Sequence, residues 1–165
     1  MLAGLFVVII FTASLILADG VNQLYVKILQ PDAPPRLVGA FTEPFTTKLI
    51  PACIVVLIHR HYEIPSVQLE SYPYGFGFLG GLSLGVVERL LYLTNKGATV
   101  TLPFAVVPVM HALNGALVAG LVFRSVNRRW DFHLTAQVLI AVMLTIAIHA
   151  MWNLFGVVLV HRIVV

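Results

Sequence analysis

The sequence predicts an all-α protein, a polytopic bundle of about five transmembrane helices that forms a single domain over residues 1–165. Two features of the composition support this class. Hydrophobic residues make up 59% of the chain and charged residues only 10%, whereas soluble domains carry about 25% charged residues. A third feature is the recurrence of apolar runs close to the roughly 20 residues that cross a bilayer. We therefore expect an integral protein of the cell (plasma) membrane.

Five segments approach the length of a span. The first, residues 2–18, has no charge and lacks the basic start of a cleaved signal peptide, so we expect a retained helix. The second, residues 37–58, is interrupted by Pro44 and Pro51, and it is the least regular of the five. The other three spans are expected at residues 74–93, 101–123 and 134–160.

The connectors are polar. A loop is expected from Asp19 through the stretch PDAPPR at 31–36, because its prolines resist helix formation. The third span should end at the turn of residues 94–97, and Thr101 can cap the fourth, with Pro103 in its first turn. The densest group of arginines in a short loop follows the fourth span, which places that side and the N-terminus in the cytoplasm.

The charge and cysteine content exclude some functions. The net charge of +3 comes from few residues, and no basic patch is long enough to follow a phosphate backbone, so we expect no nucleic-acid partner. The single cysteine, Cys53, cannot form an intrachain disulfide and is expected to be a buried, inert thiol. The sequence does not indicate an oligomeric state.

Glycines recur every four residues in the third span. Gly77, Gly81 and Gly85 lie on one helical face, and small residues at this spacing let a neighbouring helix approach closely. The letters GFGFLG at 75–80 also match a dinucleotide-binding fingerprint, but that motif requires a strand before it and a βαβ unit around it. We therefore interpret the glycines as a packing face.

The same span contains an acid, Glu88, about six residues before the expected helix end, or roughly 9 Å inside it. A carboxylate at that depth costs several kcal/mol unless it has a partner. Arg89 can extend toward the interface, whereas Glu88 cannot. Tyr92 follows four residues later on the same face.

The next two spans supply candidate partners. His111 lies near the middle of the fourth span, and His149 and Asn153 are spaced i, i+4 in the fifth, which places them on one helical face. If the three spans run antiparallel, Glu88, His111 and Asn153 reach similar depths. Each histidine alone is more often a hydrogen-bonded core residue than a ligand, but ionisable groups inside a membrane are functional candidates by default.

Two chemical schemes use these groups. In the first, Glu88, His111 and His149 hold a zinc ion with an open position for water. In the second, which is metal-free, Glu88 is a general base, His111 holds the water, and His149 with Asn153 stabilises the oxyanion. Both schemes hydrolyse an amide inside the membrane. The sequence has no HExxH, which would strengthen the zinc scheme, and no GxSxG or intramembrane aspartate pair that would favour another hydrolase class.

These blocks resemble, in order, those of the PrsW-like intramembrane proteases, within the type II CAAX-processing and bacteriocin-processing membrane proteases. The resemblance covers residues 75–156. It is carried by GFGFLGGLSLGVVERLLYL, PVMHALNGALVAG and IHAMWNLFG. It implies an enzyme, an intramembrane endopeptidase that acts on a membrane protein or peptide. It also assigns the site to a glutamate with a tyrosine four residues on, a single histidine, and a His-x-x-x-Asn pair, which here are Glu88, Tyr92, His111, His149 and Asn153.

The chain departs from the family in an earlier helix, which usually carries a Glu-Glu-x-x-Lys block. FTEPFTTK at 41–48 offers only Glu43 and, at a longer spacing, Lys48. We interpret Glu43 as an interfacial acid paired with Lys48 or water. Arg89 also stands where the family often has asparagine. Two other functions stay open: a non-catalytic cluster that binds a partner helix, lipid or ion, and a small transporter with a Glu/His proton relay.

Overall fold

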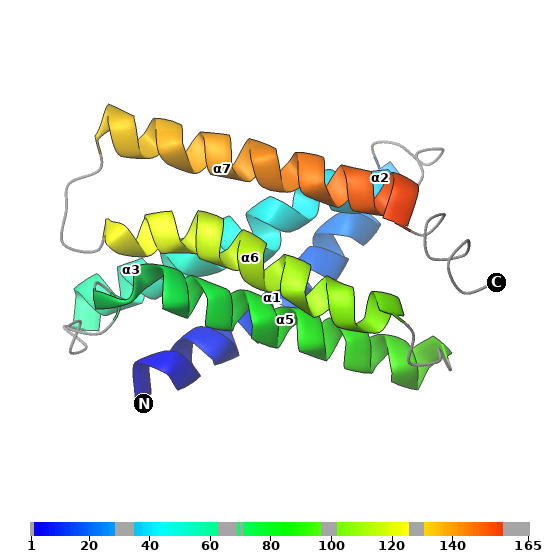
Figure 1. Ribbon diagram of the computed structural model, residues 1–165, viewed down its shortest axis with the longest axis horizontal. Coiled ribbons are helices and arrows are strands. Elements are labelled where there is room, and N and C mark those ends of the chain that lie inside the picture. Colours follow the sequence, from blue (N-terminus) through cyan, green and yellow to red (C-terminus); the bar gives the residue numbers. More distant parts are fainter. Residues whose placement is uncertain are drawn as a thin grey trace.

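The protein is a bundle of helices in the computed structural model, which describes residues 2–28, 35–62, 69, 71–96, 102–125 and 131–156. The described residues contain no strand, so the all-α prediction is confirmed. Figure 1 shows the helices in chain order. Their bounds are α1 Leu2–Ile28, α2 Pro35–Pro44, π-helical η1 Phe45–Leu49, α3 Ile50–Tyr62, α5 Pro73–Lys96, α6 Leu102–Arg124, α7 Phe132–Met151 and π-helical η2 Trp152–Gly156.

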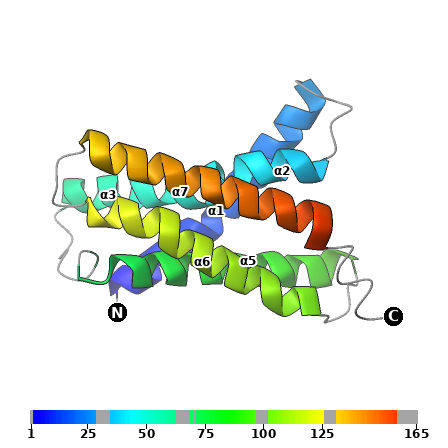
Figure 2. The same cartoon turned by 45° about the horizontal axis from the view of Figure 1, so that its top comes forward.

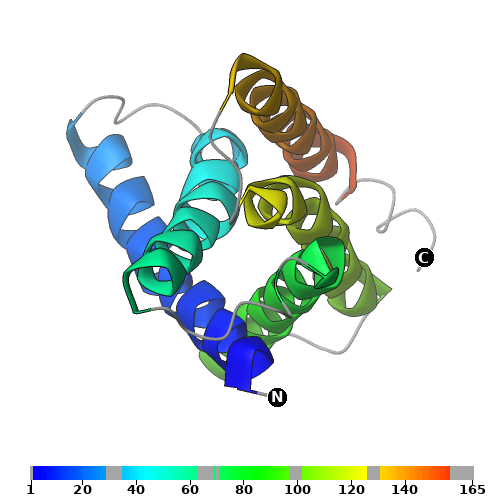
Figure 3. The same ribbon diagram turned by 90° about the vertical axis from the view of Figure 1, so that its left-hand side faces the viewer.

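Successive long helices run in opposite directions. α1, α5 and α7 point one way, and the α2–α3 segment and α6 point the other way (Figures 1 and 2). The view along the bundle in Figure 3 shows α7 beside α6 and the α2–α3 segment, with α1 and α5 on the other side. The helix ends therefore gather at two ends of the bundle, and residues eight to ten positions from the same end reach similar depths.

Four helices among the described residues are long and apolar enough to cross a membrane, with windows at Gly4–Val21, Gly39–Tyr62, Ala105–Arg124 and Phe132–Phe155. The fifth, α5, has 24 residues and is about 36 Å long at 1.5 Å per residue. Its glycines and its charged residues make it less apolar. Large apolar side chains stay exposed along α1 and α7, such as Ile16 and Ile140, as expected for surfaces that face lipid.

The first helix is longer than the sequence predicted. α1 continues through Asp19 to Ile28, where the sequence suggested a polar loop. The Gln23 amide Nε2 donates to Asp19 Oδ2 at 2.8 Å, one helical turn away, so these polar side chains support the helix instead of ending it. The remainder of the predicted loop, residues 29–34, lies outside the described residues.

The interrupted second span is one kinked helix. Pro44 ends α2, and the next turn is π-helical, with the Ile50 backbone N–H donating to the Phe45 carbonyl. Proline removes a backbone donor and displaces the preceding turn, and single π turns are frequent at functional sites. The hydroxyls of Thr46 and Thr47 donate to the carbonyls of Thr42 and Glu43. The kink turns Thr46, Thr47 and Lys48 toward the interior, where all three are buried.

The predicted glycine face is confirmed on α5. A Cβ added at Gly77 would lie 2.5 Å from the Gly115 carbonyl oxygen, and one at Gly85 would lie 2.6 Å from Pro108 Cα. At Gly81 it would overlap the His111 carbonyl. α5 and α6 therefore pack backbone against backbone, as small residues permit. This contact fixes where Glu88, one turn beyond Gly85, meets α6.

The other predicted boundaries shift by a few residues. α3 extends to Tyr62, and α5 extends to Lys96, into the turn expected at 94–97. Asp131 caps α7, its carboxylate accepting from the Leu134 N–H at 2.7 Å. The fifth span was predicted to reach residue 160, and residues 157–160 lie outside the described part. Cys53 is a free, half-buried thiol on α3.

The core and one end of the bundle are closed by packing and arginine contacts. Phe11 on α1 meets Phe123 on α6 edge to face, with ring centroids 6.5 Å apart. Arg60 donates to the Ser125 carbonyl at 2.8 Å, and Arg124 to the Tyr74 hydroxyl at 3.1 Å. These contacts join α3, α5 and α6 at the end that holds the α1 N-terminus. The buried polar residues described next lie toward the opposite end.

Candidate functional site

Buried polar side chains from four segments meet between α2–η1, α5, α6 and α7. His111 and His149 are each 2% exposed and Lys48 is fully buried, whereas the side chains of Glu88 and Glu43 are 25% and 29% exposed. A polar group in this setting is costly unless it is paired. The contacts of these residues therefore determine what the site can do.

The first contact joins α5 to α6. Glu88 Oε2 lies 2.9 Å from His111 Nε2, and Glu88 Oε1 accepts from Arg89 at 3.1 Å. The close approach at Gly81 and Gly85 brings the two helices near enough for this contact. The sequence predicts that Glu88 and His111 lie at similar depth, and the structure brings them together.

The second contact comes from the π-helical kink. Lys48 Nζ lies 2.9 Å from His111 Nδ1 and donates to the Thr47 hydroxyl at 2.6 Å. An ammonium group has no acceptor, so His111 Nδ1 must accept this bond. The imidazole proton is then on Nε2, which donates to Glu88. Lys48 thus fixes the His111 tautomer that suits the carboxylate.

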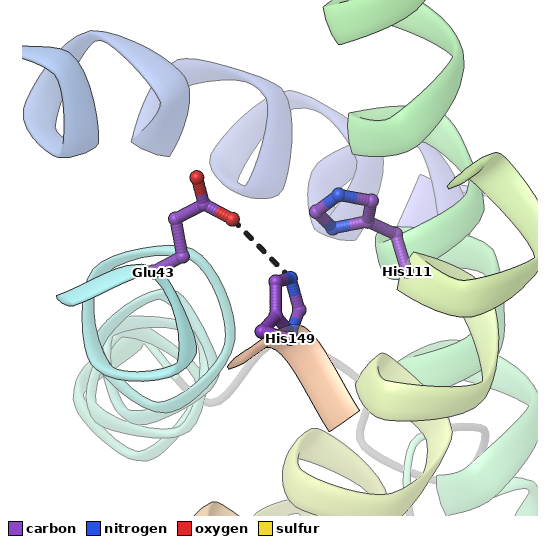
Figure 4. A group of neighbouring side chains, drawn as sticks. All are labelled: Glu43, His111 and His149. Carbon is purple, nitrogen blue, oxygen red and sulfur yellow. Dashed lines mark ion pairs between the residues drawn. The ribbon is translucent and has the colours of Figure 1, made fainter. Parts of the chain in front are cut away.

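The third contact pairs α2 with α7. Glu43 Oε2 lies 3.2 Å from His149 Nε2, the pair marked in Figure 4. The distance is that of an ion pair, but the geometry of a hydrogen bond is not met: among the described residues, buried His149 Nε2 has no hydrogen-bond partner. On the other side of the ring, His149 Nδ1 lies 3.2 Å from the Thr145 carbonyl and 3.3 Å from the Asn114 amide nitrogen.

The two imidazoles lie next to each other. Their centroids are 5.2 Å apart and their planes are nearly perpendicular. Figure 4 shows both rings and the Glu43 carboxylate directed toward one region between the helices. One donor atom from each of Glu43, His111 and His149 lies within 4.8 Å of the other two.

The zinc set predicted from the sequence was Glu88, His111 and His149. In the structure, Glu88 Oε2 faces His111 Nε2 directly at 2.9 Å, so these two atoms bond to each other. The carboxylate that shares a region with both imidazoles is that of Glu43. Two imidazoles with one carboxylate are a donor set suited to zinc, and the unpartnered His149 nitrogen can accept a metal ion.

The other predicted residues lie near the site. Asn153 is half-buried in η2, the π-helical turn that follows α7, one turn beyond His149. The amide found at His149 Nδ1 belongs instead to Asn114 of α6. The side chain of Tyr92 lies outside the described part of the structure.

The sequence pattern indicates no role for Asn114, and it predicts that Glu43 is an interfacial acid paired with Lys48 or water. Asn114 follows His111 by three residues, which is the spacing of one helical face, and that signal could have found it. Glu43 and Lys48 carried a signal through their partial match to the family block. The structure pairs Glu43 with His149 and Lys48 with His111, instead of pairing them with each other.

Comparison of the chain with protein families, curated proteins and solved structures finds no match.

Proposed function

We propose that the protein is an intramembrane endopeptidase of the plasma membrane that hydrolyses a peptide bond in a membrane-embedded or membrane-proximal substrate. The observation that carries the proposal is the 2.9 Å contact between Glu88 and His111 inside the helix bundle. An acid held against an imidazole is the usual arrangement for activating water. The resemblance to PrsW-like proteases, which assigns the same two residues, supports the same function.

In the proposed reaction, Glu88 takes a proton from water while the water oxygen attacks the peptide carbonyl carbon. His111 donates its Nε2–H to Glu88 and so holds the carboxylate in place beside the water. In this metal-free reaction, the negative charge that forms on the carbonyl oxygen is met by hydrogen bonds from Asn153 and from His149 with its ring proton on Nε2. As the C–N bond breaks, Glu88 returns the proton to the leaving amine, which leaves a free amine and a carboxylic acid that then loses its own proton to water.

Two features of the site support this chemistry over a sealed structural pair. The Glu88 side chain is 25% exposed, so it can contact a bound substrate. The His111 side chain is only 2% exposed and cannot reach a substrate by itself. His149 Nε2, one ring away from His111, has no hydrogen-bond partner among the described residues, so it is available to a ligand. In a purely structural cluster, polar groups at this depth are expected to be satisfied.

The experiment compares membranes of cells that express the wild type or Glu88→Gln. Mass spectrometry of protein N-termini should find new termini, within or beside transmembrane segments, that require Glu88. Loss of a general base costs about 10²- to 10⁴-fold in rate, so these termini should disappear in the variant. Glutamine can still accept from the His111 Nε2–H through its amide oxygen, so the variant should fold.

The matched control is Asp19→Asn, the same carboxylate-to-amide change at an exposed position on α1. It should leave the termini unchanged. A non-catalytic cluster that binds a partner helix, lipid or ion predicts a different pattern. Glu88→Gln would then lower the thermal stability of the protein, and no terminus would depend on Glu88, which would refute the peptidase.

A further inference from the structure

His149 Nε2 lies at ion-pair distance from Glu43 but has no hydrogen-bond partner among the described residues. If His149 Nδ1 carries the ring proton, it can donate to the Thr145 carbonyl 3.2 Å away, and Nε2 then presents a lone pair. That lone pair faces Glu43 Oε2 at 3.2 Å, so two hydrogen-bond acceptors lie next to each other with no proton between them. His149 is only 2% exposed. Such an arrangement needs a cation or a proton between the two atoms. In the other tautomer His149 Nδ1 accepts from the Asn114 amide 3.3 Å away, and the ring proton on Nε2 fills this place.

The geometry points to a site for a divalent transition-metal ion, zinc in the first instance, formed by Glu43, His111 and His149. The donor atoms of these three residues lie within 4.8 Å of one another. Two ligand atoms on a tetrahedral zinc ion, each about 2.0–2.1 Å from the metal, lie about 3.3 Å apart. The observed 3.2 Å between Glu43 Oε2 and His149 Nε2 is the separation that such a metal requires.

The surroundings of His149 match those of a metal-bound histidine. Such histidines almost always donate their second ring N–H to a carbonyl or carboxylate, which fixes the tautomer and aims the free nitrogen at the metal. The Thr145 carbonyl fills this role, and it belongs to the preceding turn of α7, the helix that carries His149. Because two imidazoles are present, the site should prefer zinc, cobalt or nickel to calcium or magnesium.

His111 must move for the ion to bind. Its two nitrogens now contact Lys48 Nζ and Glu88 Oε2, each at 2.9 Å. A 4.8 Å limit also exceeds the ligand spacing of a zinc site by about 1.5 Å, so the ring must turn toward Glu43 and His149. Binding therefore exchanges one existing His111 hydrogen bond for the metal. The three ligands come from three helices, α2, α6 and α7 (Figure 4).

The test measures metal content and affinity, which do not depend on peptidase activity. The full chain is purified in detergent, stripped with a chelator, incubated with zinc, dialysed and analysed by mass spectrometry for bound metal. A competition titration then gives the affinity. We expect one zinc per chain in the wild type and at least about a tenfold loss of affinity in Glu43→Gln and His149→Gln, since even loss of an outer contact costs 10- to 100-fold.

Two controls locate the site. His133→Gln makes the same imidazole change as His149→Gln at an exposed position on α7, and it should bind zinc as the wild type does. Glu88→Gln should also retain one zinc, because Glu88 lies outside the proposed ligand set. Thermal unfolding of each zinc-free variant checks that the chain is folded.

The proposal is overturned if the wild type binds no zinc, if Glu43→Gln binds it as tightly as the wild type, or if only Glu88→Gln loses it. In the first case the 3.2 Å contact would be a protonated imidazole paired with a carboxylate. Failure here leaves the peptidase standing, because Glu88 and His111 can act without metal. Conversely, bound zinc without cleavage would refute the peptidase and retain the metal site.

Discussion

Glu88 Oε2 on α5 and His111 Nε2 on α6 lie 2.9 Å apart, and this contact joins two helices that pack backbone against backbone. Each side chain lowers the free-energy cost of burying the other, because an unpaired carboxylate or imidazole would be costly at this depth. Lys48 extends this series of hydrogen bonds by donating to the second ring nitrogen of His111, Nδ1. The polar residues form one connected network across three helices.

The Glu88–His111 contact predicts energetic coupling between the two positions. Glu88→Leu and His111→Leu should each leave a buried partner unsatisfied, so the double variant should lose less stability than the sum of the single changes. Hydrogen bonds between membrane helices contribute about 0.6 kcal/mol on average and up to about 1.7 kcal/mol, which sets the expected coupling. Unfolding in detergent of the four proteins measures it.

The control cycle combines Glu88→Leu with His133→Leu, at an exposed position on α7. Distant sites usually add within about 0.5 kcal/mol. Additivity in the Glu88–His111 cycle as well would mean that the two side chains do not interact in the folded protein.

The glycine face predicts a sharp difference between two glycine-to-alanine changes. At Gly81 the new methyl group would overlap the His111 carbonyl, so α5 and α6 would have to separate. Overpacking of this kind costs about 1–3 kcal/mol. At Gly20 nothing lies within 4 Å, and alanine should gain about 0.5–1 kcal/mol through helix propensity. Thermal unfolding of both variants checks the difference, and equal stability would contradict the close packing.

Lys48 predicts a particular tautomer of His111. Because Lys48 donates to Nδ1, the proton should reside on Nε2. Nitrogen NMR of protein labelled at histidine distinguishes the protonated from the unprotonated ring nitrogen, and His111→Gln identifies the signal. Lys48→Met should remove the preference for Nε2–H, while the signal of exposed His133 stays unchanged. A His111 ring protonated on Nδ1 in the wild type would contradict this role of Lys48.

Much of the fold followed from local features of the sequence. Apolar runs near the length of a span predicted the long helices, and Gly77, Gly81 and Gly85 predicted the close helix contact because their spacing is regular. The same contact made the meeting of Glu88 with His111 predictable. Depth alone predicted that His111 would meet Asn153, with His149 one turn deeper, whereas in the structure it is the His149 ring that lies beside His111.

Other features depended on tertiary structure. Pro44 marked an interruption, but the π-helical turn that follows it, and the direction in which it turns Lys48, arise from packing against the other helices. This is why Glu43 and Lys48 were interpreted as an interfacial pair although they contact different histidines. Asp19 was read as the start of a loop because composition does not reveal that Gln23 supports it within the helix.

Hydrolysis in isotopic water tests the Glu88–His111 pair most directly. Purified wild type and Glu88→Gln are incubated in H₂¹⁸O with a peptide that spans a cleavage site found in cell membranes. The wild type should place one ¹⁸O atom in the new carboxyl group, at a rate about 10²- to 10⁴-fold above that of the variant. Equal rates in the two proteins would show that Glu88 does not activate the water, and the proposed peptidase site would be wrong.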